Sequence, residues 1–277
     1  FYTLPLGRNL AFRVYADSRP HNLETARLQK GLVLMFNEKE IIEEGMGFGV
    51  PVAIFSDKTY FSGSAQVSSS EDGKNKTILK HFFMDTVSRK SWKGGVYVDN
   101  PLYKLFSGSL ASTYRDYPAS RRVIFPLIKL RNKVGVRTHF TKVESRGEFT
   151  VTYKIKRNGL DITADLTKLN KNHCRKVLLL NEQGSTFFRK FFDSDSLSFT
   201  DEKIGAWDLI KVDWACFSNL DNTLSFCLRG LPNCRLFRGR EHIRGRLAWA
   251  GMGYELSPNL DFFNYKVQIH LEKMKNA

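Results

Sequence analysis

Residues 148–169 read EFTVTYKIKRNGLDITADLTKL, and this stretch decides the fold class. In its first half apolar residues alternate with polar or charged ones, the period-two pattern of a β-strand with one buried and one solvated face. The apolar set is Phe149, Val151, Tyr153 and Ile155. Asn158-Gly159 then supplies a residue pair preferred in tight hairpin turns, and a second alternating run follows. The stretch predicts two antiparallel strands with one wet face.

Short strand-like runs of the same kind continue on both sides, among them GLVLMFN (31–37), VPVAIFSDKTYFSG (50–63), DLIKVDWACF (208–217) and NYKVQIHLEK (264–273). Ser56-Asp57-Lys58 marks a further hairpin turn, whereas Asn37 to Glu44 is expected to form one short helical turn with Asn37 as its cap. No long amphipathic helix separates the strands. We therefore expect an all-β chain, a large antiparallel β-sandwich or supersandwich with few short helices.

Length and composition favour one folded unit. The chain has 277 residues, 42% of them hydrophobic, which is enough to bury a core without metals or disulfides. No Pro-, Gly- or Ser-rich linker divides it, so we expect a single β-sandwich domain over residues 1–277.

The surface is strongly basic. Lys and Arg exceed Asp and Glu by 43 to 28, a formal charge of +15. Nucleic acid, acidic polysaccharide, phosphorylated sugar and anionic membrane surfaces all fit such a field, and solubility alone explains it too. Net charge does not choose among them.

Cysteine spacing argues against a structural metal, because Cys174, Cys216, Cys227 and Cys234 form no CxxC pair and match no zinc-site spacing. Cys216 and Cys227 are compatible with adjacent strands, and Cys234 with either as a partner, but buried free thiols explain the same positions. We expect no metal and no cofactor.

No run of about 18 apolar residues occurs, so no transmembrane segment is expected. The chain begins at Phe1 without a signal region. A soluble protein is expected, either cytoplasmic or exported after removal of a leader, and the oligomeric state stays open.

The strands of residues 148–169, together with SPNLDFFNYKVQIHLEK at 257–273, resemble the long antiparallel strands of galactose mutarotase-like supersandwich proteins. The resemblance covers about half of the chain in character and includes no catalytic motif. It implies the supersandwich fold. Because that superfamily contains sugar epimerases, glycoside hydrolases and polysaccharide lyases, it also favours a carbohydrate ligand.

The densest polar cluster is RLFRGREHIRGR at 235–246. Arg supplies paired donors for carboxylate, sulfate or phosphate, while His exchanges a proton near neutral pH and Glu can orient it. We assign catalysis to His242 and Glu241 and ligand binding to Arg238, Arg240, Arg244 and Arg246. The alternative is a solvated loop in which Arg and Glu pair.

In an extended strand the four arginines and His242 would share one face, and Glu241 would face the other way. Cooperation between Glu241 and His242 therefore requires a bulge at Gly239 or Gly245.

A second candidate joins Glu43 and Glu44 to the glycine-rich segment at 45–49 and to Tyr60. Glu44 is assigned as an acid or base, and Tyr60 as an aromatic surface for a sugar ring. The alternative is a tight entry into a strand. The glycine spacing matches no phosphate-binding loop, so nucleotide binding here is not expected.

These observations favour a carbohydrate-active or carbohydrate-binding protein for an acidic or phosphorylated glycan, and they leave open whether it is an enzyme. The alternative is a noncatalytic binding or assembly module for nucleic acid or protein partners. Nucleic acid ranks below glycan because no aromatic RNA-binding motif, zinc finger or recognition helix is present.

Overall fold

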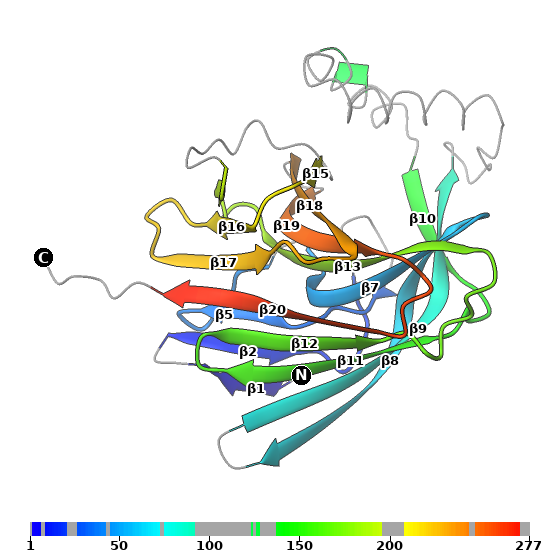
Figure 1. Cartoon of the computed structure of the whole chain (residues 1–277), viewed down its shortest axis with the longest axis horizontal. Coiled ribbons are helices and arrows are strands. Elements are labelled where there is room, and N and C mark those ends of the chain that lie inside the picture. The colour runs from blue at the N-terminus through cyan, green and yellow to red at the C-terminus, as the bar shows by residue number, and fades with distance from the viewer. Residues whose placement is uncertain are drawn as a thin grey trace, which may run out of the picture.

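The computed structural model describes residues 2–6, 9–20, 27–42, 45–72, 75–91, 123, 126–127, 137–195, 208–243 and 247–271. Within these ranges β-strands dominate (Figure 1). The strands are β1 (Tyr2–Pro5), β2 (Leu10–Val14), β3 (Arg19–Pro20), β4 (Arg27–Leu28), β5 (Val33–Phe36), β6 (Lys39–Glu40), β7 (Gly47–Phe55), β8 (Thr59–Asp72), β9 (Asn75–Ser91), β10 (Arg137–Lys142), β11 (Glu148–Lys156), β12 (Gly159–Asp165), β13 (Cys174–Gly184), β14 (Lys190–Asp193), β15 (Asp208–Ile210), β16 (Trp214–Ser218), β17 (Leu224–Arg229), β18 (Cys234–Ile243), β19 (Leu247–Leu256) and β20 (Phe262–Leu271).

The predicted all-β class is confirmed. A sheet of 14 strands has the order β14-β16-β17-β20-β12-β11-β9-β8-β7-β13-β19-β18-β15, with β10 paired to β9. A smaller sheet has the order β1-β2-β5-β6. The strands of both sheets pair in antiparallel fashion, as the alternating sequence pattern predicted.

The large sheet folds back on itself to form the layers of a sandwich. Strands far apart in the sheet order meet through interior aromatic rings: Phe48 of β7 lies 5.4 Å from Phe226 of β17, and Tyr254 of β19 lies 5.0 Å from Tyr265 of β20, centroid to centroid. The small sheet joins the same core, because Phe12 of β2 lies 6.3 Å from Phe48. Strands of both sheets therefore contribute to one large apolar cluster, beside which two smaller clusters are buried.

The β11–β12 hairpin forms as its sequence predicts. Tyr153 stands opposite Ile162; the two turn residues are Arg157 and Asn158, one position before the predicted Asn158-Gly159 pair, and Gly159 begins β12 opposite Lys156 with a φ of 140° that favours glycine. Phe149, Val151 and Tyr153 have no solvent exposure and Ile155 only 7%. The predicted buried face is confirmed, and its opposite face carries threonine and lysine.

The helical turn expected at residues 37–44 is wrong. Asn37 and Glu38 form a two-residue turn between β5 and β6, with φ angles of 49° and 64°. Positive φ at both central residues is typical of the primed turns that match the twist of a hairpin. Met35 and Phe36 pair with Glu40 and Lys39, so strand pairing overrides the helix cap that the sequence suggested.

Polar side chains inside the core fasten the N-terminal segments to the large sheet. Lys80 of β9, only 1% exposed, donates from Nζ to the backbone oxygens of Tyr15 (2.8 Å) and Lys30 (2.6 Å). Asn181 of β13 accepts from the backbone N–H of Gly49 at 3.1 Å and from the Tyr265 hydroxyl at 2.9 Å. The Lys80 ammonium group and the Asn181 Oδ1 atom are tolerated in the core because these hydrogen bonds satisfy them.

In the part of the chain that the structure describes, no helix has the length and apolar character to cross a bilayer. The same residues contain no group of three or more His, Cys, Asp or Glu arranged to hold a metal ion.

Candidate functional site

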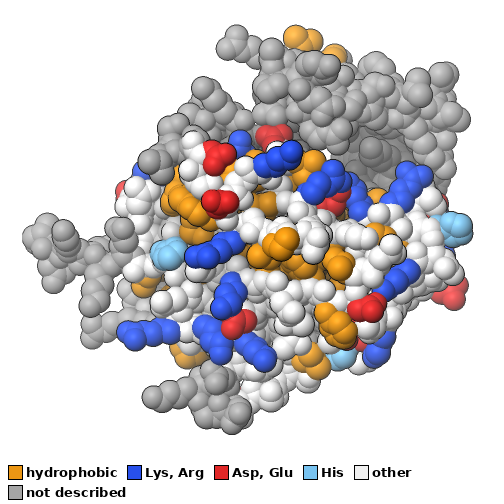
Figure 2. All heavy atoms as spheres, viewed as in Figure 1, with side chains coloured by type: hydrophobic (Ala, Val, Ile, Leu, Met, Phe, Trp, Pro, Cys, Tyr) orange, Lys and Arg blue, Asp and Glu red, His pale blue; other side chains and the backbone are white. Residues whose placement is uncertain are grey.

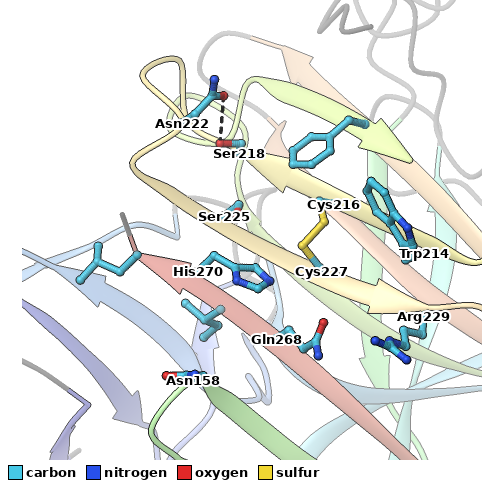
Figure 3. Close-up of a pocket in the computed structure, with 13 residues that line it drawn as sticks. Asn158, Trp214, Cys216, Ser218, Asn222, Ser225, Cys227, Arg229, Gln268 and His270 are labelled. Carbon is cyan, nitrogen blue, oxygen red and sulfur yellow. Dashed lines mark hydrogen bonds between the residues drawn. A yellow bond between two sulfur atoms is a disulfide. The ribbon is translucent and has the colours of Figure 1, made fainter. Parts of the chain in front are cut away.

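A depression of about 810 Å³ opens on the solvated face of the large sheet, over β14, β16, β17 and β20 (Figure 3). The turn at Asn158 closes one side, held there by a 2.9 Å hydrogen bond from the Ile269 N–H to the Asn158 carbonyl. The core lies on the opposite face of the same strands, where Phe217, Phe226 and Val267 are buried. The depression is therefore built mainly from outward-facing residues, and Ile269, a core residue of β20, also borders it.

Strand register brings these residues together in rows. Trp214 stands opposite Arg229, Cys216 opposite Cys227, and Ser218 opposite Ser225 across β16 and β17. The rows continue onto β20, since Ser225 pairs with His270 and Cys227 with Gln268. Directly opposite residues of an antiparallel pair project from the same face, so all these side chains border one space.

An aromatic wall stands at the β14–β16 end of the depression. The rings of Phe192 and Trp214 meet edge to face, with centroids 5.8 Å apart and planes at 79°. Both residues are partly exposed, so ring surface remains available to a ligand. Aromatic rings give a rigid apolar contact surface, and the indole N–H adds one hydrogen-bond donor.

Polar groups without acidic neighbours line the rest. Arg229 and His270 are exposed and Gln268 is partly exposed. Among the described residues, none of these three side chains has a hydrogen-bond or ion-pair partner. None of the thirteen lining residues drawn in Figure 3 is Asp or Glu. Among the lining residues that the structure describes, the Arg229 guanidinium therefore has no carboxylate beside it.

A disulfide forms the floor. The sequence left open whether the cysteines pair; in the structure Cys216 is bonded to Cys227 across β16 and β17, and the Cα atoms are 4.1 Å apart. Cys174 and Cys234 are free. At one end of the floor the Ser218 hydroxyl lies 3.4 Å from Asn222 Oδ1, which also accepts from Lys190 Nζ at 3.3 Å.

The arginines assigned from sequence lie elsewhere. β18 is extended, and Arg238 and Arg240 stand opposite Met252 and Ala250 of β19, both fully buried. The two arginines therefore share one face, as predicted, but that face borders the sandwich interior and not a solvated loop. Neither residue lines the depression.

Contacts of these two arginines are with the protein itself. The guanidinium of Arg238 lies 3.5 Å from the buried Asp193 carboxylate and 4.3 Å from the centroid of the Phe191 ring. Arg240 donates to the Ser185 carbonyl at 3.2 Å. Such contacts hold β18 against β14 and the end of β13.

The rest of the assigned cluster is described only in part. β18 pairs with β19 residue by residue through Gly239, with no register shift as far as Ile243, so the bulge considered at Gly239 does not form. The side chains of Glu241 and His242 lie outside the described structure, as do Arg244 and Arg246 altogether. Their assigned roles stay predictions.

The second assigned cluster is also described only in part. Glu44 lies outside the described residues. Tyr60 is 4% exposed, packs edge to face on Phe55 at 5.1 Å, and accepts a 3.1 Å hydrogen bond from Arg146 Nε. Its ring is thus largely covered by the protein's own side chains.

Sequence reasoning did not single out the residues of the depression. The signal is the alternation within WACFS (214–218) and LSFCLR (224–229), which places Trp, Cys and Ser on one face of the first strand and Ser, Cys and Arg on one face of the second. Which strand β20 would lie beside cannot be read from that pattern, because the pairing joins segments about forty residues apart.

No protein-family model and no curated protein matches the chain. Several solved structures are similar to it, among them the following two. One is an α-N-acetylgalactosaminidase, NagBb from Bifidobacterium bifidum in complex with GalNAc, with 10% identity and a TM-score of 0.44; the match covers 100% of this chain and 36% of that one, so the chain spans about a third of that enzyme's length. The other is a galactose mutarotase-like protein from Lactobacillus casei, with 8% identity and a TM-score of 0.40, covering 98% of this chain and 99% of that one. The second belongs to the class that the strand pattern resembles.

Proposed function

We propose that the chain binds an acidic or phosphorylated carbohydrate in the depression between β14, β16, β17 and β20. The observation that supports this most is the pairing of Trp214 with Arg229 across adjacent strands, at the rim of a space whose described lining residues include no carboxylate. An aromatic surface next to a cation suits a ring that has an apolar face and an anionic substituent.

The carbohydrate part of the proposal depends on the mixture of groups. Sugar rings present an apolar face of C–H groups and a periphery of hydroxyls. Trp214 and Phe192 offer ring surface to the former, while Gln268, Asn158 and Ser225 offer hydrogen-bond donors and acceptors to the latter. Ligand sites commonly combine an apolar lining with a few polar groups that fix orientation.

The anionic part depends on charge. Arg229 presents a planar set of donors that matches carboxylate, sulfate or phosphate oxygens, and His270 of β20, which stands opposite Ser225, lines the same depression further along β17. The chain as a whole has a formal charge of +15, which attracts anions from a distance. Figure 2 shows Lys and Arg side chains spread over the face on which β17, β20 and β12 lie in Figure 1.

The depression is proposed as a binding site and not as a hydrolytic centre. Glycoside hydrolysis usually requires two carboxyl groups flanking the bond, and the thirteen lining residues provide none. Any turnover would have to use groups elsewhere, for which Glu241 and His242 stay the proposed pair.

Calorimetric titration with matched oligosaccharides tests the proposal. An oligogalacturonate, its methyl-esterified form and a neutral galactan should bind in falling order of affinity. Arg229→Gln should weaken oligogalacturonate by at least about tenfold, since a charge-assisted hydrogen bond is worth roughly 1.5–3 kcal/mol. The same change should leave the esterified ligand nearly unaffected.

Trp214→Ala should weaken all three ligands by about tenfold, whereas Trp214→Phe should keep most of the affinity. Arg175→Gln is the matched control, because Arg175 is an exposed arginine of β13 that does not line the depression. Equal effects of Arg229→Gln and Arg175→Gln would contradict the site.

The alternative of a nucleic-acid module has its own signature in this assay. Single-stranded oligonucleotide binding that falls steeply with salt, together with no response to any glycan, would replace the carbohydrate proposal.

A further inference from the structure

The disulfide at the floor of the depression occupies the centre of the site. Cys216 lies between Trp214 and Ser218 on the outward face of β16, and Cys227 lies between Ser225 and Arg229 on the outward face of β17. In Figure 3 the sulfur bridge lies between the two strands, with Trp214 and Arg229 to one side of it. The bridge lies two residues along each strand from Trp214 and Arg229, the pair that the proposed ligand would contact.

The backbone around that pair has limited support. β17 pairs with β20 only from Leu224 to Cys227, so Arg229 lies beyond the end of this ladder. On the other side of β17, β16 pairs with β17 over five positions and with β14 over four. β14 is the last strand at this edge of the sheet. Two further hydrogen bonds hold the end of β17, from the Tyr254 hydroxyl to the Arg229 carbonyl (2.7 Å) and from the Gly230 N–H to the Asp213 carbonyl (2.8 Å). The bridge adds a covalent constraint to these few hydrogen bonds, two residues along each strand from the Trp214–Arg229 pair.

We propose that the Cys216–Cys227 disulfide is a redox lock on this depression: reduction by a dithiol loosens the β16–β17 pair and weakens ligand binding, and bound ligand protects the bridge from reduction. The ligand part of this inference rests on the function proposed above. In the reaction a dithiol transfers two electrons and two protons; the S–S bond breaks, two cysteine thiols form, and the dithiol closes to its own disulfide.

The route by which a reductant reaches the bridge explains why bound ligand should protect the bridge from reduction. Cys216 is 3% and Cys227 6% exposed, and the surface that they retain contributes to the lining of the depression. A thiolate must approach along that opening to attack either sulfur. A ligand seated over the floor blocks the approach, and a ligand that prefers the bridged form must by linkage favour the bridge.

The first measurement needs no ligand. Hydrogen exchange followed by mass spectrometry, before and after treatment with dithiothreitol, reports on the backbone of residues 208–230. We expect exchange to accelerate there and to stay unchanged in β11 and β12. Cys216→Ala/Cys227→Ala should reproduce the effect without reductant, and Cys174→Ala/Cys234→Ala, which keeps the bridge, should not.

The second measurement uses oligogalacturonate as the probe. Its affinity should fall by about tenfold or more on reduction and in Cys216→Ala/Cys227→Ala. Saturating oligogalacturonate should slow reduction of the bridge severalfold, measured by alkylation of Cys216 and Cys227.

The two proposals fail separately. Absence of oligogalacturonate binding to the oxidised protein refutes the proposed function, whereas unchanged exchange over residues 208–230 on reduction refutes the lock. Loss of exchange protection throughout the chain, including β11 and β12, also refutes it, because a lock acts on one hairpin. Equal affinity in the oxidised and reduced states would refute the coupling even if exchange changes.

Discussion

Lys80 makes the stability of the fold depend on pH in an unusual direction. Its ammonium group is inside the sandwich, hydrogen-bonded to the carbonyls of Tyr15 and Lys30 and 5.1 Å from the centroid of the Phe82 ring. Burial disfavours the charged form and lowers the pKa of Lys80 from 10.5 to about 7, with only a partial opposing effect from Asp17. In the unfolded chain the same group keeps its ordinary pKa.

The sign follows from the two pKa values. Between pH 7 and 10.5 the unfolded chain holds a proton at Lys80 that the folded chain has released, so the free energy of unfolding rises with pH. Well above pH 7 each pH unit contributes about 1.4 kcal/mol; because the folded chain still holds half of its Lys80 protons at pH 7, the rise from pH 7 to pH 9 is about 2 kcal/mol. Below pH 7 both states hold the proton, and this contribution no longer changes with pH.

Urea unfolding of wild type and Lys80→Met at pH 6, 7, 8 and 9 measures the effect. Met preserves the alkyl volume but leaves two buried carbonyls without their donor, at a cost of about 1–3 kcal/mol for each. We expect Lys80→Met to lose the slope above pH 7 and so to be more destabilising at pH 9 than at pH 6. Lys154→Met, on the exposed face of β11, is the control and should keep the slope.

Wild-type stability that stays flat from pH 7 to pH 9, or that rises equally in Lys80→Met, would refute this reasoning. The comparison stops at pH 9 because burial raises the pKa of Tyr153, and a group of that kind removes stability as the pH approaches its unfolded pKa.

Three further predictions concern the turn, the site and catalysis. Gly159→Ala should destabilise the fold by more than about 1 kcal/mol in urea, because φ is +140° and a Cβ would lie 1.9 Å from the Val267 carbonyl oxygen; Lys266→Ala on the same strand as Val267 should cost far less. The affinity of Arg229→Gln for oligogalacturonate should become less sensitive to salt than that of wild type, as titrations at 50 and 300 mM salt would show, and an unchanged salt dependence would remove Arg229 from the site. If the chain turns over an acidic glycan, His242→Ala should abolish turnover without weakening binding, and full activity of this variant in a product assay would exclude His242 from the mechanism.

The local part of the fold was predictable from sequence, and the interior part was not. Alternation predicts both strands of the β11–β12 hairpin, and the Asn158-Gly159 pair places its turn to within one residue, because both are properties of neighbouring residues. Lys80 shows where this reasoning ends: it shares the buried face of β9 with Ile78 and Phe82, a position that the pattern rule reserves for apolar residues. It is accepted there because carbonyls from two distant segments meet its ammonium group, and no local pattern contains those contacts.

The arginines of β18 are a second case in which a local sequence pattern does not determine the environment of a side chain. Their shared face followed from the period of a strand, but the direction of that face depends on what packs against it. Asp193 of β14 and the Phe191 ring provide partners at the edge of the interior, so Arg238 stabilises the junction of two strands. A high density of arginines in a sequence therefore shows only that cations are present. Whether they form a binding surface or an internal contact depends on the residues that pack against them in the folded protein.

The core and the depression lie on opposite faces of the same strands, so the stability of the fold and the proposed function depend on the same strand register. On β16 and β17 the inward residues Ala215, Phe217, Phe226 and Leu228 are at most 1% exposed, while the residues between them form the site. A slip of one residue in the β16–β17 register would place Trp214 and Arg229 on different faces and turn phenylalanines toward water. The core therefore enforces the register on which the site depends. The bridge between Cys216 and Cys227 adds a covalent link to that constraint on the outward face of the same two strands.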